Sequence, residues 1–128
     1  MSNLFDKTTD ALATSIRMRQ LRHNVTSSNI ANAETPHYHA KKVDFENALA
    51  SALEMDNISL SEGGSSNYTE KLSVEAYDNP DVAVNNDGNT VDLEKEMSAL
   101  AENSIMYKTA LQLINKKMAA MKYALGER

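Results

Sequence analysis

The chain of 128 residues contains no cysteine and no tryptophan, only two phenylalanines and only four glycines. The absence of cysteine excludes disulfides, thiolate catalysis and cysteine-ligated zinc. With so few aromatic residues and glycines, the chain has little material for a concave apolar pocket or a phosphate-binding glycine loop, and it carries no nucleophile motif. The sequence therefore predicts a protein that is not an enzyme and that uses no cofactor.

Long apolar runs are missing as well. No stretch approaches the roughly 18 consecutive apolar residues of a membrane-spanning helix, so no membrane span is expected. Residues 1–14 do not form the basic and apolar regions of a secretory signal, because Asp6, Lys7 and Asp10 interrupt them. A charged fraction of 24% is typical of a soluble chain, and the length suits one structural unit over 1–128.

Charge is distributed unevenly along the chain. Of the 18 acidic residues, thirteen lie between Asp44 and Glu96, a window with only two basic residues, so both ends are basic. Solvated surfaces account for this pattern without any partner. Alternatively, the acidic middle of one copy faces the basic helices of another. Nucleic-acid binding is not expected, because Arg17, Arg19 and Arg22 form a weak cluster without aromatic neighbours.

The clearest positive signal is an apolar repeat in the last third of the chain. Apolar residues recur there in steps of four and three, interrupted only at Ser104. The repeat predicts a helix within 91–126, of roughly 33 residues and about 50 Å, with one narrow seam. So long a helix needs a partner helix in the same chain or in a neighbour, which indicates an assembly element. The predicted seam consists of Leu93, Met97, Leu100, Tyr107, Leu111, Ile114, Met118, Met121 and Leu125.

A second long helix is predicted over 3–34. Asn3 is a suitable N-cap with Asp6 in the first turn. The helix should end before Pro36, because the residue preceding a proline avoids the α conformation. Its many Thr, Ser and Asn residues make it marginal without a packing partner. The residues predicted to pack it are Leu4, Ala11, Met18, Leu21 and Val25.

The middle segment, 35–90, carries mixed signals. The expected elements are an extended segment at 37–45, a short amphipathic helix at 46–55, a linker at 62–67, a half-buried strand at 71–77 and a polar loop at 78–90. Asp92 should then cap the C-terminal helix. The predicted fold is mainly α, with long N- and C-terminal helices paired as a coiled coil and a short irregular, β-containing acidic middle segment.

Two groups of side chains offer possible metal ligands. His37 and His39 share a face of an extended segment, and Asp44, Glu46 or His23 could complete a site. Histidines in a lysine-rich loop are more often simply exposed, so no metal is predicted there.

The second group imitates a calcium-binding loop over 83–94. Asn85, Asp87, Gly88 and Glu94 match its third, fifth, sixth and twelfth positions. Ala83 occupies the first position, where aspartate is usual, and no helix signal precedes the loop. We therefore predict no calcium site.

The end of the N-terminal helix is rich in amide and small side chains. Asn29 and Asn32 can bond backbone groups that are freed where the helix ends. Ala31 and Ala33 allow another helix to approach closely, and Pro36 fixes the direction in which the chain leaves. From these properties alone, an ordinary capped helix end stays an open alternative.

The run from Asn29 to Tyr38 resembles the signature of bacterial flagellar axial proteins of the rod and hook family, which is close to N-I-A-N-A-x-T-P-G-Y. Val43-Asp44-Phe45 and the stretch from Gly88 to Tyr107 resemble the proximal rod members of that family. His37 departs from the pattern, because the family usually has glycine there; at φ > 0 the histidine would be strained. The matching motif residues are Asn29, Ile30, Ala31, Asn32, Thr35, Pro36 and Tyr38.

The resemblance implies a structural subunit of the flagellar basal body, in the proximal rod, whose terminal helices pair into a layer around the export channel. It also implies export to the periplasmic rod by the flagellar type III apparatus. The implied partners are other rod proteins, further copies of the chain, the basal body adaptor protein and the flagellar export gate. The alternative is a small helical adaptor or export chaperone of the same secretion system, which would have no reason for the Asn-Ile-Ala-Asn and Thr-Pro motif.

Overall fold

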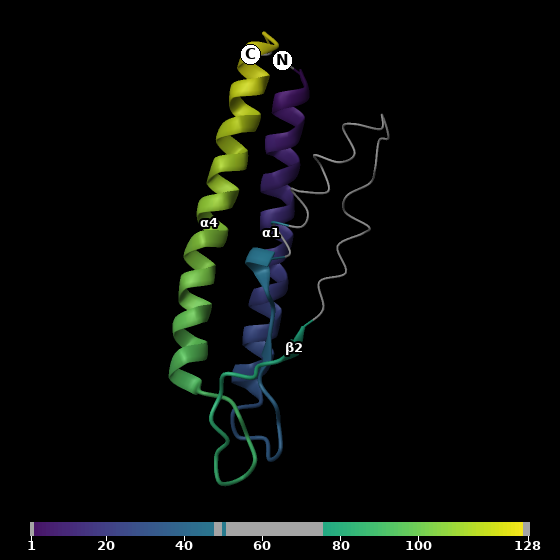
Figure 1. Cartoon of the computed structure of the whole chain (residues 1–128). Helices are drawn as coiled ribbons and strands as arrows, with labels where there is room; N and C mark the ends of the chain where they lie inside the picture. Colours follow the sequence, from purple (N-terminus) through teal and green to yellow (C-terminus); the bar gives the residue numbers. More distant parts are fainter. Residues whose placement is uncertain (1, 48–49, 51–75, 127–128) are drawn as a thin grey trace, which may run out of the picture.

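Two long helices dominate the protein. The computed structural model describes residues 2–47, 50 and 76–126, with side chains from residue 7 onward. Helix α1 spans Ser2–Ala31 and helix α4 spans Leu93–Ala124. They lie side by side and antiparallel, so that the start of α1 and the end of α4 are at the same end of the pair (Figure 1). The mainly α fold with paired terminal helices is confirmed.

Local sequence signals account for both ends of α4. The Asp92 side chain accepts a hydrogen bond from the Lys95 amide, so Asp92 is the predicted N-cap, and Glu94 and Glu96 lie in the first turn, where they complement the helix dipole. At the other end, the Gly126 amide donates to the Tyr123 carbonyl, and Gly126 has φ 73°. Glycine adopts this left-handed conformation without a Cβ penalty, which makes it a good helix terminator.

Helix α1 differs from its prediction at both ends. It already includes Ser2 and Asn3, so the prediction that Asn3 is the N-cap is wrong. It ends at Ala31, three residues before the predicted end, because the Asn32 amide and side chain both bond the Ser28 carbonyl and divert the chain into a turn. Pro36 therefore lies within the turn and does not itself stop the helix.

A small β element follows the turn. Strand β1, Lys41–Lys42, pairs with strand β2, Tyr77–Asp78, in antiparallel register, with Lys41 opposite Asp78 and Lys42 opposite Tyr77. This confirms a β-containing middle segment, although each strand has only two residues. The predicted linker at 62–67, and nearly all of the predicted helix at 46–55 and strand at 71–77, lie outside the described residues.

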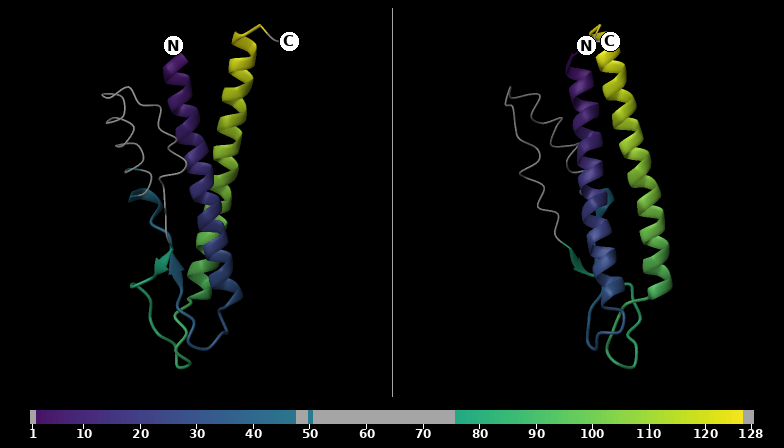
Figure 2. Two further views of the ribbon diagram at one scale, coloured as in Figure 1. Left: turned by 90° about the vertical axis from the view of Figure 1, so that its right-hand side faces the viewer. Right: turned by 180° about the vertical axis from the view of Figure 1, so that it is seen from behind.

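Helix α1 contacts both α4 and β1, and it lies between α4 and the β element in the right-hand view of Figure 2. Its Met18 is buried with Val43 and Phe45 in a small apolar cluster, against which Leu21 and Val25 also pack. One face of α1 is therefore covered by α4 and the opposite face by the start of the middle segment. No helix in the described part of the chain is both long and apolar enough to cross a membrane.

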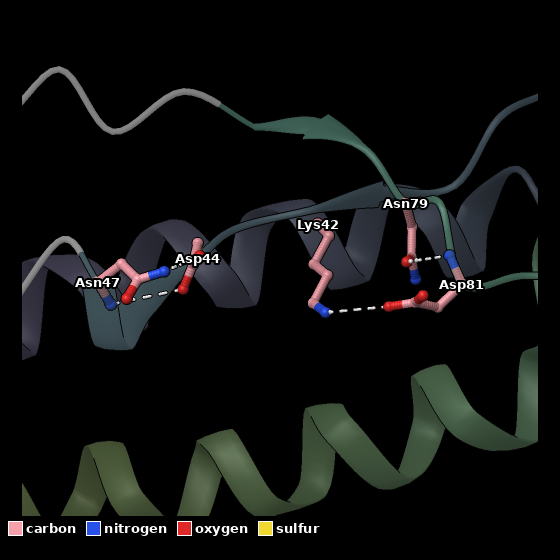
Figure 3. A network of polar contacts seen from close by, with 5 residues as sticks. All are labelled: Lys42, Asp44, Asn47, Asn79 and Asp81. Carbon is pink, nitrogen blue, oxygen red and sulfur yellow. Dashed lines mark hydrogen bonds and ion pairs between the residues drawn. The ribbon is translucent and has the colours of Figure 1, made fainter.

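Short polar contacts shape the exposed side of this middle segment (Figure 3). Asp44 accepts hydrogen bonds from the Asn47 amide and side chain, and so caps the helical turn at 45–47. Lys42 Nζ lies 3.8 Å from Asp81 Oδ2, and the Asp81 amide donates to the Asn79 side chain. Because the lysine and aspartate side chains are exposed, this ion pair contributes at most about 1 kcal/mol.

Candidate functional site

The motif at the end of α1 forms a junction between the two helices, and Asn29 is one of its two centres. Asn29 is fully buried. Its side chain donates to the Lys41 carbonyl at 2.8 Å and accepts from the Lys41 amide at 2.9 Å, as a neighbouring strand would. It also accepts from the Tyr38 hydroxyl at 3.2 Å and donates to Glu96 Oε2 at 3.2 Å. One side chain thus joins α1, β1 and α4.

Asn89 is the second centre and is also fully buried. Its amide donates to the carbonyls of Asn32 and Thr35 at 2.9 and 2.7 Å, which are among the groups left free after α1 ends. Its carbonyl oxygen accepts from the Val91 amide at 2.7 Å. The loop before α4 therefore caps the end of α1 and holds the two helices in their antiparallel arrangement.

The two loops also run beside each other through the backbone. The Thr90 amide donates to the Tyr38 carbonyl at 3.0 Å, and the Thr90 hydroxyl accepts from the Ala40 amide at 2.8 Å. The His37 amide donates to the Asp87 carbonyl at 3.1 Å. These bonds pair backbone donors and acceptors of the two loops, which holds the loops together.

His37 and Gly88 meet at the tip of the junction. His37 has φ 59° and Gly88 has φ 77°, so both residues are left-handed. His37, at the family's glycine position, therefore has the left-handed backbone that glycine adopts most readily, and histidine is among the residues better tolerated there. A Cβ atom on Gly88 would lie only 2.5 Å from His37 Nδ1. The histidine ring therefore occupies the space that only a glycine at residue 88 leaves open.

The motif residues take different positions in the junction. Asn29 is buried, Asn32 and Thr35 bond each other through their side chains at 3.1 Å, and Tyr38 is partly buried. Ile30 is partly buried, whereas Ala31 and Pro36 are exposed. The motif thus contributes chiefly through its amide and hydroxyl side chains.

The possible metal ligands do not converge. Among the described residues there is no group of three histidine, aspartate or glutamate side chains that could hold a metal ion. In the calcium-like loop, Asp87 Oδ1 accepts from the Asn89 amide, and the Asn85 carbonyl accepts from the Gly88 amide. These are the bonds of an ordinary turn.

The predicted seam of α4 is divided in the structure. Its partly buried members are Leu100, Tyr107, Leu111, Ile114 and Met121, and its exposed members are Leu93, Met97, Met118 and Leu125. The buried residues of α4 are Asn103 and Ala110, one position before Ser104 and Leu111. The helix therefore turns toward α1 a face adjacent to the predicted seam, which leaves part of the apolar row uncovered.

The predicted packing residues of α1 are divided in the same way. Met18, Leu21 and Val25 pack in the cluster with Val43 and Phe45. Ala11 is partly buried, and the Leu4 side chain lies outside the described residues. Much of the apolar stripe of α1 therefore packs against the middle segment.

Sequence reasoning did not identify three polar residues as site residues. Glu96 bonds Asn29, Asn89 caps α1, and Asn103 Nδ2 donates to the Arg19 carbonyl at 2.8 Å. A repeat of apolar residues gives no signal for a buried amide. A signal for Asn89 was available in its place directly after Asp87-Gly88, within the predicted polar loop.

Arg19 lies where α1, α4 and the middle segment meet. Its guanidinium carbon is 4.7 Å from the centre of the Phe45 ring, a cation–π contact. Burial, followed by the nearby Arg22 charge, lowers the pKa of Arg19, while Glu102 acts in the opposite direction. Because an arginine side chain titrates far above neutral pH, it stays charged.

Curated proteins resemble the chain over almost its whole length, although no protein-family model matches it. The flagellar basal body rod protein FlgB of Aeromonas hydrophila is 33% identical over 128 residues, covering 98% of this chain and 97% of its own. FlgB of Bacillus subtilis is 33% identical and covers 96% of both chains. FlgB of Cereibacter sphaeroides is 36% identical and covers 88% of this chain and 89% of its own. The chain belongs to the FlgB family of flagellar basal body rod proteins.

Proposed function

We propose that the chain is a structural subunit of the proximal rod, which assembles through the apolar face that α4 leaves uncovered. The exposed residues of the predicted seam support this proposal. Leu93, Met97, Met118 and Leu125 are 45%, 57%, 56% and 77% exposed. They extend over nearly the whole length of α4, whereas solitary exposed apolar residues would need no explanation.

The energy available from this face is considerable. Covering one large apolar side chain completely contributes roughly 1.5 to 3 kcal/mol. Several such side chains on one helix would therefore favour contact with a neighbouring subunit, even after the cost of ordering the subunits. Copies of the chain and other rod proteins are the proposed partners.

A charge placed on this face tests the proposal. Met118→Asp changes a side chain that is 56% exposed, so the isolated chain should keep its fold. Gln112→Asp introduces the same charge at another exposed position of α4 and is the matched control. We expect Met118→Asp to abolish motility and to be lost from purified basal bodies, while Gln112→Asp is retained. Normal recovery of Met118→Asp in basal bodies would refute the proposal.

The finer role is part of the same proposal. The single unit over 1–128 would link the export gate and the MS ring to the rest of the rod, contact the basal body adaptor protein, and leave the cytoplasm through the type III apparatus. The polar composition of α1, with a mean hydropathy for the chain of -0.50, supports passage in a poorly folded state. The alternative role as an adaptor or export chaperone has no support from the three similar proteins named above, each of which is named as a rod protein.

A further inference from the structure

Arg19 is part of α1 and makes contact with both α4 and the middle segment. Its backbone belongs to α1, and its carbonyl accepts the Asn103 amide of α4 at 2.8 Å. Its guanidinium lies 4.7 Å from the centre of the Phe45 ring in the middle segment. We propose that Arg19 is a positioning residue that couples α4 to the start of the middle segment.

The contact with Phe45 has the properties of a directional interaction. Phe45 is 8% exposed and belongs to the cluster with Met18 and Val43. Its ring is therefore in contact both with apolar side chains and with the cation. A partly desolvated cation over an aromatic face fixes the ring's orientation as well as its depth, because the attraction depends on the face of the ring.

The contact with α4 involves a buried amide side chain. Asn103 is 3% exposed, and its Oδ1 atom has no hydrogen-bond partner among the described residues. A buried acceptor without a partner destabilises the folded protein, and an apolar residue would avoid that cost. What Asn103 provides in return is the bond to Arg19. Glu102, the preceding residue, supplies a negative charge that acts on the guanidinium of the same arginine.

The coupling has a structural consequence. Phe45 begins the helical turn at 45–47 and lies a few residues after β1. If Arg19 moves with α4, the position of this turn follows the position of α4. The turn at 45–47 and the exposed apolar face of α4 would then keep a fixed relation within each subunit.

Hydrogen exchange at the Phe45 amide, which donates to the Val43 carbonyl at 3.1 Å, measures the coupling in the full chain. Arg19→Met keeps the apolar stem and removes the cation. We expect exchange at Phe45 to accelerate about fivefold, the equivalent of roughly 1 kcal/mol for a cation–π contact. Arg17→Met changes an exposed arginine on the same helix and should leave this rate unchanged.

Two further variants separate coupling from simple packing. In a Phe45→Leu background, which keeps apolar volume but removes the ring, Arg19→Met should have no additional effect on exchange at residue 45. Glu102→Gln, on α4, should accelerate exchange at Phe45 about twofold, as expected for an exposed charge. Glu94→Gln is its control. Equal effects of Arg19→Met and Arg17→Met, or an unchanged rate in Glu102→Gln, would overturn the proposal.

Discussion

The contact between His37 and Gly88 leads to a quantitative prediction for Gly88→Ala. Residue 88 has φ 77°, and a left-handed backbone costs a residue with a Cβ atom about 1 to 2 kcal/mol relative to glycine. The added Cβ would also lie 2.5 Å from His37 Nδ1 and 3.2 Å from its Cε1. Such contacts force the ring out of its position, at a further cost of about 1 kcal/mol. We therefore expect Gly88→Ala to lower the free energy of unfolding by about 2 to 3 kcal/mol.

The two costs can be measured separately with a double-mutant cycle. His37→Gly removes the ring, so in that background Gly88→Ala should cost only the backbone contribution of about 1 to 2 kcal/mol. His37→Gly alone should be nearly neutral. Glycine adopts the left-handed conformation more readily than histidine, which stabilises the folded state by about 1 kcal/mol. It also raises the conformational entropy of the unfolded chain, which lowers the free energy of unfolding by a similar amount.

Chemical unfolding of the four proteins, followed by circular dichroism, gives the coupling energy directly. A coupling of about 1 kcal/mol is expected; in thermal unfolding it corresponds to roughly 4 °C between the shifts in melting temperature that Gly88→Ala causes in the two backgrounds. The same loss from Gly88→Ala in both backgrounds would show that the ring is not the obstacle. A loss below about 0.5 kcal/mol in both would show that the junction tolerates a different turn at residue 88.

Three further predictions concern the junction and α1. Asn29→Ala should destabilise the chain by about 3 kcal/mol, since it leaves the Lys41 backbone without partners; chemical unfolding measures this, and a loss below about 1 kcal/mol would contradict it. Pro36→Ala should reduce swarming more than His37→Gly, because it frees the direction in which the chain leaves α1; the reverse order would assign the histidine a role of its own. In the isolated monomer, amides at 7–16 should exchange faster than those of α4, and equal protection would show that α1 needs no neighbours.

The parts of the fold that were predictable are those with local causes. Asp92 caps α4 through an amide three residues away, and the apolar repeat that follows predicts one uninterrupted helix. The left-handed backbone at His37 could also be anticipated, because this residue stands at a position where the family has glycine.

The parts that were not predictable depend on distant partners. The carbonyls of Asn32 and Thr35, in the turn after α1, are bonded by Asn89, which is 57 and 54 residues away, so the sequence near α1 could not show what holds this turn. The face of α4 that packs against α1 could not be predicted either. Several rows of α4 are apolar, and the buried amide of Asn103 lies outside the row that the repeat selects.

The long separations in the junction also determine when it can form. Asn29 reaches Glu96 across 67 residues and Arg19 reaches Asn103 across 84, while the bonds of Asn29 to Lys41 span only 12. At roughly 5 to 20 residues per second, a ribosome takes several seconds to supply the second half of the longer contacts. During that interval α1 can already contact β1, but α4 is not yet available to pack against it. The helix pair can therefore close only after the chain has been made as far as Asn103, whereas the contact between α1 and β1 can form much earlier.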